Sequence, residues 1–267
     1  MIKELLQPFP KLATVHQYLQ FYLRRPRYRS PISSKAQALF LQLATEGYVV
    51  LENYFTAEEC TALCQDLFHV FQQFPEYVHQ KSDRRFFGID KAIPTAKRFA
   101  DDPLFQELAN AVNGLPSQTA FTMAGVLSAE SRGSSGEGWH RDAFFSQFKA
   151  MAYLTNVGLE NGPFEILSGS HRLQQILRDI NTANLRQNQN RLSDEETSRL
   201  IEAEPNRLKT LTASAGTVIL FNSSTVHRGR PIVKGERIAL TNYVYEESHF
   251  GEWMIRHFAP LYPHSMN

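Results

Sequence analysis

The chain has 267 residues and a mass of 30.5 kDa, and its 42% apolar and 21% charged residues are ordinary for a globular protein, which argues against a fibrous or disordered chain. The formal net charge of +1 provides no overall field for a nucleic-acid backbone, so we expect no nucleic-acid partner. No stretch approaches the roughly 18 apolar residues of a membrane span, and the first residues lack the apolar core of a signal peptide. We therefore expect a cytoplasmic protein without stable membrane insertion; the sequence leaves its oligomeric state open.

The N-terminal segment is strongly basic, and we expect residues 1–45 to form a helical extension. Its charged residues within positions 1–30 give a net charge of +5: Lys3, Lys11, Arg24, Arg25, Arg27 and Arg29 against Glu4. A solvated surface is the simplest interpretation of the cluster from Arg24 to Arg29. A phosphate-binding patch for a CoA-like substrate and a weak membrane contact are the alternatives.

The first strand and its following helix are predicted from residues 47–74. Residues 47–55 are β-branched and aromatic, which is typical of a strand. Thr56 and Glu59 form a capping box, in which each side chain satisfies a free backbone N–H group, and a helix then runs to Phe74. Cys60 and Cys64 lie on this helix, and we expect both to be reduced.

Short β-rich runs separated by turn residues dominate the chain from residue 119 to 245. The runs are 119–130, 144–157, 163–167, 208–213, 216–222 and 236–246. This spacing favours a β-sandwich or jelly roll. Residues 171–204 are polar, and Ser193 and Glu196 offer a second capping box, so we expect a helical insertion there. We predict one domain over residues 1–267, with its mainly β core at about 47–250 and flanking helices.

A candidate metal site is formed by His140 and Asp142, two residues apart, so that a strand would direct both side chains to one face. Alone, this pair is a weak signal. The apolar strand 216–222 is followed by His227, which provides a second imidazole. Two histidines and one carboxylate can form a facial triad that leaves positions open on a ferrous ion. A structural zinc site would need a fourth protein ligand, and none is suitably spaced.

The run 235–245 places a basic residue in a strand that alternates in character. Arg237, Ala239, Thr241 and Tyr243 share one face, and Ile238, Leu240 and Val244 share the other. We expect the apolar face to pack on a core and the first face to line a polar cavity. An arginine in such a cavity needs an anionic partner.

The stretch from Leu154 to His171, LTNVGLENGPFEILSGSH, together with His140, Asp142 and the segment from Gly216 to Arg237, resembles the phytanoyl-CoA dioxygenase family of Fe(II)/2-oxoglutarate oxygenases. The resemblance covers about Gly138 to Tyr245 and implies a double-stranded β-helix, a cupin-like jelly roll. It implies Fe(II), 2-oxoglutarate and O2 as cofactor and cosubstrates. Gly229 departs from relatives that hold 2-oxoglutarate with a hydroxyl residue at this position.

The resemblance also implies residue roles. His140, Asp142 and His227 would ligate iron, and Arg237 would pair with the distal carboxylate of 2-oxoglutarate. Thr155 is a weaker candidate for a second cosubstrate contact, and a basic residue of segment 84–91 can compensate for Gly229. Three aromatic residues near the metal turn are candidates for the substrate wall, with a plain core role as the alternative: Trp139, Phe144 and Phe145.

The expected reaction is hydroxylation of a small metabolite, in a biosynthetic or specialised-metabolite pathway, with release of succinate and CO2. Demethylation, desaturation and cyclisation begin with the same hydrogen abstraction and stay open. Because Asp142 is a carboxylate where related halogenases have a small residue, halogenation is disfavoured. The alternatives are an acyl-CoA hydroxylase, a non-catalytic jelly-roll protein that binds metal or 2-oxoglutarate, and a zinc hydrolase with the same ligands.

Overall fold

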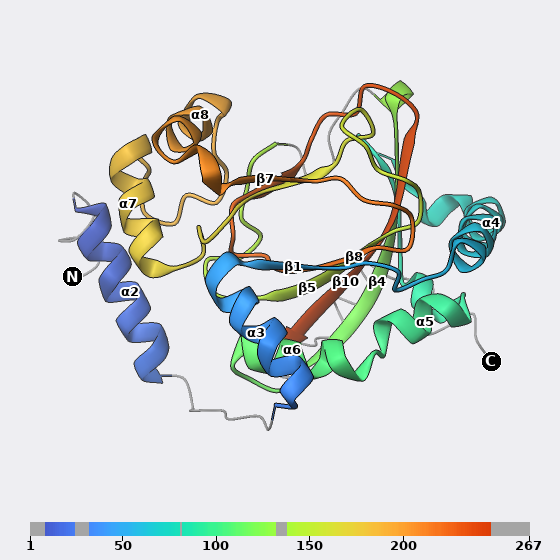
Figure 1. Ribbon diagram of the computed structural model, residues 1–267, viewed down its shortest axis with the longest axis horizontal. Coiled ribbons are helices and arrows are strands. Elements are labelled where there is room, and N and C mark those ends of the chain that lie inside the picture. Colours follow the sequence, from blue (N-terminus) through green and yellow to red (C-terminus); the bar gives the residue numbers. More distant parts are fainter. Residues whose placement is uncertain (1–8, 25–31, 81, 132–137, 247–267) are drawn as a thin grey trace.

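Two antiparallel sheets occupy the centre of the computed structural model, which describes residues 9–24, 32–80, 82–131 and 138–246 (Figure 1). The larger sheet has the strand order β1-β8-β5-β10-β4-β3-β2, and the smaller has the order β7-β6-β9. The strands are β1 Tyr48–Leu51, β2 His79–Gln80, β3 Arg84–Phe87, β4 Ser117–Ser128, β5 Phe148–Tyr153, β6 Phe164–Leu167, β7 Leu208–Leu211, β8 Val218–Asn222, β9 His227–Gly229 and β10 Glu236–Glu246. This arrangement confirms the predicted jelly roll.

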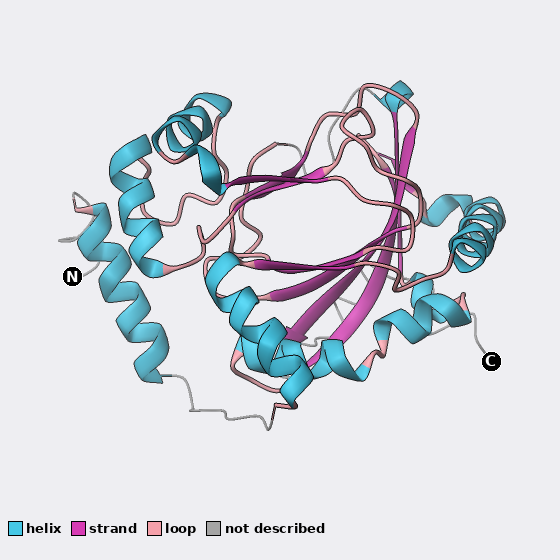
Figure 2. Cartoon of the chain, viewed as in Figure 1, coloured by secondary structure: helices cyan, strands magenta, loops and turns pink. Residues whose placement is uncertain are grey.

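Helices cover the outer side of the larger sheet and one end of the molecule (Figure 2). They are α2 Pro10–Arg24, α3 Ser34–Glu46, α4 Ala57–Gln73, α5 Pro94–Ala100, α6 Pro103–Asn113, α7 Leu173–Ala183 and α8 Asp194–Ala203. Short 3-10 turns lie at Pro75–Tyr77, Ile89–Lys91, Ala129–Ser131 and Pro205–Arg207. No helix in these described ranges is both long and apolar enough to cross a membrane.

The alternation of the central strands separates two apolar layers. On β5, Ala150 and Ala152 join the core beneath α3, α4, α5 and α6, whereas Met151 and Tyr153 join a second cluster between the two sheets. Strand β10 divides in the same way, because Ile238, Leu240 and Val244 belong to the outer core. The period of two therefore reserves the opposite face of β10 for the interior of the jelly roll.

The end of the molecule near α2, α7 and α8 has its own apolar cluster. Tyr18 of α2, Ile176 and Ile180 of α7, and Leu200 of α8 pack with Trp139. In Figure 1 these three helices gather on the side away from α4 and α5. Residues 171–204, expected as a polar helical insertion, thus contain α7 and α8.

Several predicted elements are present with shifted ends. The capping box at Thr56 and Glu59 begins α4, and the one at Ser193 and Glu196 begins α8, each with both reciprocal hydrogen bonds. Cys60 and Cys64 are free thiols on α4.

The predicted strand at 144–157 is shorter, because residues 143–147 form a loop before β5. Strands β2, β3 and β9 and helices α5 and α6 were not predicted individually. Arg25, Arg27 and Arg29 of the basic cluster lie outside the described residues.

Candidate metal centre

A cavity of about 190 Å³ lies between the two sheets and contains the candidate metal site. Its described lining combines residues of β3, β4, β5, β6, β8, β9 and β10 with residues of connecting loops: Arg85, Met123, His140, Asp142, Lys149, Met151, Phe164, Arg191, Phe221, His227, Gly229, Arg237, Thr241 and Tyr243. Arg237, Thr241 and Tyr243 come from the face of β10 that the sequence alternation assigned to a polar cavity.

The structure brings His140, Asp142 and His227 together at this cavity. One possible ligand atom from each lies within 4.8 Å of the others. His140 and His227 exchange two backbone hydrogen bonds of 2.9 Å, and the Asp142 N–H group donates to the Ser223 carbonyl at 3.0 Å. The histidine Nε2 atoms each lie 3.5 Å from an Asp142 carboxylate oxygen. Backbone pairing between His140 and His227, which are 87 residues apart in the sequence, therefore fixes the donor set.

The tautomers of both histidines suit metal binding. Nδ1 of His140 lies 2.8 Å from the Gly138 carbonyl oxygen, and Nδ1 of His227 lies 2.8 Å from the Thr225 carbonyl oxygen. A carbonyl oxygen only accepts, so each Nδ1 must carry the proton and leave the Nε2 lone pair for a ligand. Burial lowers the pKa of His227 even though Asp142 opposes this change, which favours the neutral imidazole.

Lys149 is an unexpected member of the site. Its ammonium nitrogen lies 2.8 Å from Asp142 Oδ2 and 3.9 Å from the centre of the Tyr243 ring. Burial alone would raise the pKa of Asp142, but the Lys149 charge and the two histidines hold that pKa well below its usual range. Burial likewise opposes the charged form of Lys149, and Asp142 and neighbouring tyrosines raise its pKa. Both groups are therefore charged at neutral pH.

The side chain of Arg141, between His140 and Asp142 in the sequence, stabilises the segment through buried contacts. It is 4% exposed and donates hydrogen bonds through Nη1 to the carbonyl oxygens of Ser170 and Ser224. Its Nη2 atom lies 3.9 Å from the carboxylate of Asp179, a buried residue of α7. His140 and Asp142 thus share one side, even though the segment consists of two isolated β-bridges at His140 and a loop rather than the predicted strand.

Arg237 lies at a second polar position of the cavity. It is 5% exposed and donates to the Gly162 carbonyl oxygen, and burial lowers its pKa. Arg85 of β3 lines the same cavity and forms a 2.7 Å ion pair with the buried Asp83. The guanidinium groups of Arg237 and Arg85 therefore line the same cavity as the candidate metal donors.

Four other predicted site residues are placed elsewhere. Thr155 accepts a 3.1 Å hydrogen bond from the Ile238 N–H group, so its hydroxyl supports strand pairing, and it is absent from the described cavity lining. Trp139 is 3% exposed in the cluster beside α7, with the Arg228 guanidinium 4.5 Å from its ring. Phe144 and Phe145, the other candidates for the substrate wall, pack against the same cluster, and neither is among the described residues that line the cavity.

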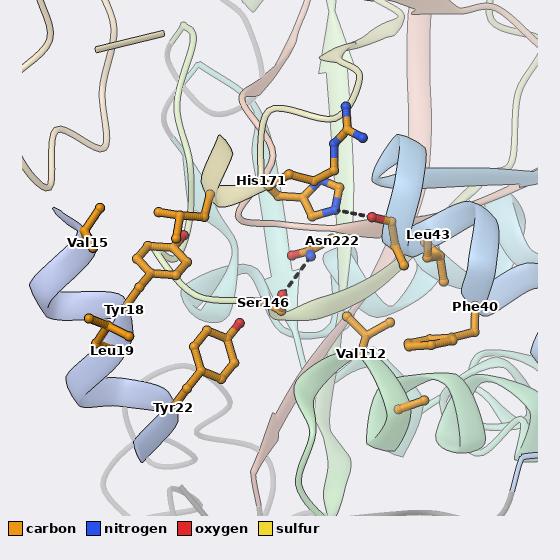
Figure 3. Close-up of a pocket in the computed structure, with 14 residues that line it drawn as sticks. Val15, Tyr18, Leu19, Tyr22, Phe40, Leu43, Val112, Ser146, His171 and Asn222 are labelled. Carbon is orange, nitrogen blue, oxygen red and sulfur yellow. Dashed lines mark hydrogen bonds between the residues drawn. The ribbon is translucent and has the colours of Figure 1, made fainter. Parts of the chain in front are cut away.

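An apolar groove between α2 and the body is the second notable cavity, with a volume of about 360 Å³ (Figure 3). Tyr18, Leu19 and Tyr22 of α2 face Phe40 and Val112 across it. At its back, His171 Nε2 lies 3.1 Å from the Ala44 carbonyl oxygen, and Asn222 donates to the Ser146 hydroxyl. No group of three potential metal ligands lies here among the described residues, so its chemistry differs from that of the central cavity.

Sequence reasoning did not identify Lys149, and it left the basic contact from segment 84–91 unassigned. The alternation of side chains along β5 could have identified Lys149. Phe148, Ala150 and Ala152 face the outer core, so Lys149 must face the interior of the jelly roll. A lysine that faces inward from an otherwise apolar strand needs a charged partner. Arg85 gave no comparable signal, because β3 is a four-residue strand among several basic residues.

The family model for "Phytanoyl-CoA dioxygenase (PhyH)" matches residues 43–237. Ectoine dioxygenases of Bordetella parapertussis and Bordetella bronchiseptica are each 25% identical over 204 residues, covering 68% of this chain and 66% of the relative. The matched region therefore spans slightly less than two thirds of those curated relatives.

Solved structures share the fold. EctD from S. alaskensis with 2-oxoglutarate and 5-hydroxyectoine is 16% identical, with a TM-score of 0.61 and coverage of 85% of both chains. HygX from Streptomyces hygroscopicus with nickel, 2-oxoglutarate and hygromycin B is also 16% identical, with a TM-score of 0.54 and coverage of 81% of this chain and 88% of that chain. At these identities the likeness concerns the fold.

Proposed function

This chain belongs to the phytanoyl-CoA dioxygenase family, and from that premise we propose that it is an Fe(II)- and 2-oxoglutarate-dependent dioxygenase that oxidises a C–H bond of a small metabolite. The observation that carries the proposal is the convergence of two imidazoles and one carboxylate within 4.8 Å. Both imidazoles direct an Nε2 lone pair toward this position, as a facial triad requires. The donor set fits a ferrous ion, and His140, Asp142 and His227 would hold it.

The bound iron would supply the oxidation, in which 2-oxoglutarate and O2 yield succinate, CO2 and an oxidised substrate. The protein's own groups bind and orient the reactants. Arg237 would pair with the distal carboxylate of 2-oxoglutarate, and the placement of Arg85 in the same cavity supports it as the second basic contact. Lys149 holds the Asp142 carboxylate by a hydrogen bond, which fixes the orientation of a metal ligand.

The walls of the cavity favour a small substrate. Met123, Met151, Phe164 and Phe221 contribute its apolar lining, and a volume of about 190 Å³ is small for a site that must also accept 2-oxoglutarate. The reaction outcome, the cytoplasmic location and the lack of a nucleic-acid partner stay predictions from the sequence.

Succinate formation tests the proposal. The purified protein is loaded with Fe(II) without oxygen, supplied with 2-oxoglutarate, and then exposed to air while succinate is measured. We expect succinate that requires Fe(II) and O2, and its loss in Asp142→Ala but not in Asp66→Ala, which changes an exposed carboxylate on α4.

Two results would contradict the proposal. Binding of 2-oxoglutarate without any succinate would favour a non-catalytic binding protein. Hydrolytic activity with zinc and without O2 would favour the zinc hydrolase.

A further inference from the structure

Arg237 and Lys149 lie at opposite ends of the central cavity. Both Arg237 and Tyr243 project from the cavity face of β10, and they are six residues apart, or about 20 Å along a strand. Lys149 is the register partner of Tyr243, whereas Tyr153 pairs with Ala239 near the Arg237 end. The backbone register therefore places the two buried cations at different parts of the cavity.

The metal donors lie toward the Lys149 end. Asp142 contacts the Lys149 ammonium at 2.8 Å, and the His227 ring is 5.4 Å from the ring of Phe221, the β8 register partner of Lys149. A 2-oxoglutarate molecule that reached from the metal to Arg237 would extend away from Lys149. The space beside Lys149 would then lie on the opposite side of the metal donors from 2-oxoglutarate and would remain for the substrate.

The charges of the cavity leave Lys149 without full compensation when the site is loaded. Asp142 is the single acidic residue among the described cavity lining. The two charges of Fe(II) and the charge of Arg237 would be balanced by Asp142 and the two carboxylates of 2-oxoglutarate. Arg85 has Asp83 as its partner, and Arg191 is exposed to solvent. The remaining positive charge is the ammonium of Lys149, a residue that is 5% exposed. A buried cation of this kind favours an anionic ligand.

We propose that Lys149 is a specificity-determining residue that binds a carboxylate of the substrate, so that the enzyme acts on a small carboxylic acid. The inference rests on the proposed function, because it places the substrate beside an occupied metal site. Met151 and Phe221 lie next to the ammonium along the strands and provide apolar contact for the rest of the molecule. A charge-assisted bond beside a hydrophobic surface discriminates an acid from its neutral amide.

The test uses probes rather than an identified substrate. The full-length protein is loaded with Co(II) and 2-oxoglutarate, which keeps the site occupied without turnover. Binding near the metal is measured from the paramagnetic broadening of the probe's own proton NMR signals. The probes are isobutyrate and benzoate, each compared with its primary amide. We expect each carboxylate to bind at least about ten-fold more tightly than its amide, because a charged hydrogen bond is replaced by a neutral one.

Three variants separate the role of Lys149 from its support of Asp142. Lys149→Gln keeps a hydrogen-bond donor but removes the charge, so we expect Co(II) loading to persist and the preference for carboxylates to disappear. Lys149→Arg restores the charge and should restore the preference. Lys35→Gln removes an exposed charge on α3 and should change nothing.

The outcomes distinguish the two proposals. If the wild-type protein binds no 2-oxoglutarate, the proposed function fails. If it binds 2-oxoglutarate but broadens no carboxylate signal, or broadens acid and amide equally, the assignment of Lys149 is overturned. It is also overturned if Lys149→Gln retains the preference for carboxylates. An about ten-fold loss of affinity for 2-oxoglutarate in that case would show that Lys149 serves the cosubstrate instead. The acid and amide comparison in the wild-type protein holds even if a variant fails to fold.

Discussion

The central cavity and the groove of Figure 3 are built on different principles. In the cavity, charged groups are fixed by sheet pairing, and His140 and His227 exchange backbone hydrogen bonds. In the groove, apolar side chains of α2 face α3 and α6 without any shared strand. The family match begins at residue 43, so α2 lies outside it. The candidate metal donors thus lie within the matched segment, whereas α2, which forms one wall of the groove, lies outside it.

The two regions are connected by the loop that follows Asp142. Tyr18 donates a 3.0 Å hydrogen bond to the Phe144 carbonyl oxygen, and the rings of Phe21 and Phe145 stack with centroids 3.5 Å apart. Helix α2 therefore contacts the segment between the candidate metal ligand and β5. If the cavity is organised by the sheets, changes in the cavity should affect ligand binding strongly, and changes around α2 should affect mainly stability.

The largest effect is expected from breaking the pair of Asp142 and Lys149. Beyond removing a metal ligand, Asp142→Ala leaves the buried Lys149 ammonium without its carboxylate. We expect the free energy of unfolding, measured with urea, to fall on the order of 3 kcal/mol. The double variant Asp142→Ala, Lys149→Met should recover most of this loss, because it removes both charges. An equal loss in the single and double variants would show that the pair does not matter.

The next effect concerns the other end of the cavity. Arg237→Leu should weaken 2-oxoglutarate binding about a hundred-fold, because the distal carboxylate loses a buried charged partner. Arg237→Lys should recover only part of the affinity, since an ammonium lacks the bidentate guanidinium geometry. Equilibrium binding to the metal-loaded protein measures both. Arg178→Leu, on an exposed position of α7, is the control, and unchanged affinity in Arg237→Leu would remove Arg237 from the site.

A smaller, pH-dependent effect is expected at the groove. Burial lowers the pKa of His171 to about 4, and its Nδ1, beside Gly47, has no hydrogen-bond partner among the described residues. The unfolded chain binds a proton at this histidine below about pH 6.5, whereas the folded protein does not until about pH 4. Stability should therefore fall as the pH is lowered through this window, by on the order of 2 kcal/mol after allowance for partial exposure.

His171→Gln isolates this contribution, because glutamine can still donate to the Ala44 carbonyl oxygen. Urea unfolding at pH 7 and pH 5 should show a smaller loss of stability in the variant than in the wild-type protein. Identical pH dependence would mean that His171 is protonated in the folded state.

The smallest effect is expected from the link between α2 and the loop. Tyr18→Phe removes the hydrogen bond to Phe144 and should lower the free energy of unfolding by about 1 kcal/mol. Affinity for 2-oxoglutarate should stay within about two-fold, because the sheet holds the metal donors. Tyr22→Phe is the matched control, since Tyr22 is exposed on the same helix. A ten-fold loss of affinity in Tyr18→Phe would show that α2 organises the cavity as well.

The sequence predicted those parts of the fold that local patterns encode. Alternation in residues 236–246 identified both faces of β10, and capping boxes located the starts of α4 and α8. Short strands such as β9, with three residues, have too little pattern to recognise. The sequence also singled out His140, Asp142 and His227, which the structure brings together, although the strand expected to align His140 and Asp142 is two isolated β-bridges and a loop.

The positions of the aromatic side chains near the metal turn could not be predicted from the sequence, because they depend on contacts between distant segments. Phe144 and Phe145 follow the candidate metal ligand directly, but α2, over a hundred residues earlier, draws both into its own cluster. Lys149 shows the opposite case. The alternation of β5 indicates that its side chain faces inward, but its role became clear only from the 2.8 Å contact with Asp142 in the structure.

The most direct test of the metal site is the visible absorption of the Fe(II) protein titrated with 2-oxoglutarate in the absence of oxygen. A metal-to-ligand charge-transfer band should appear in the wild-type protein, require more 2-oxoglutarate in Arg237→Leu, and be absent in Asp142→Ala. The absence of the band in the wild-type protein, or an unchanged band in Asp142→Ala, would contradict the assignment of His140, Asp142 and His227 as the iron site.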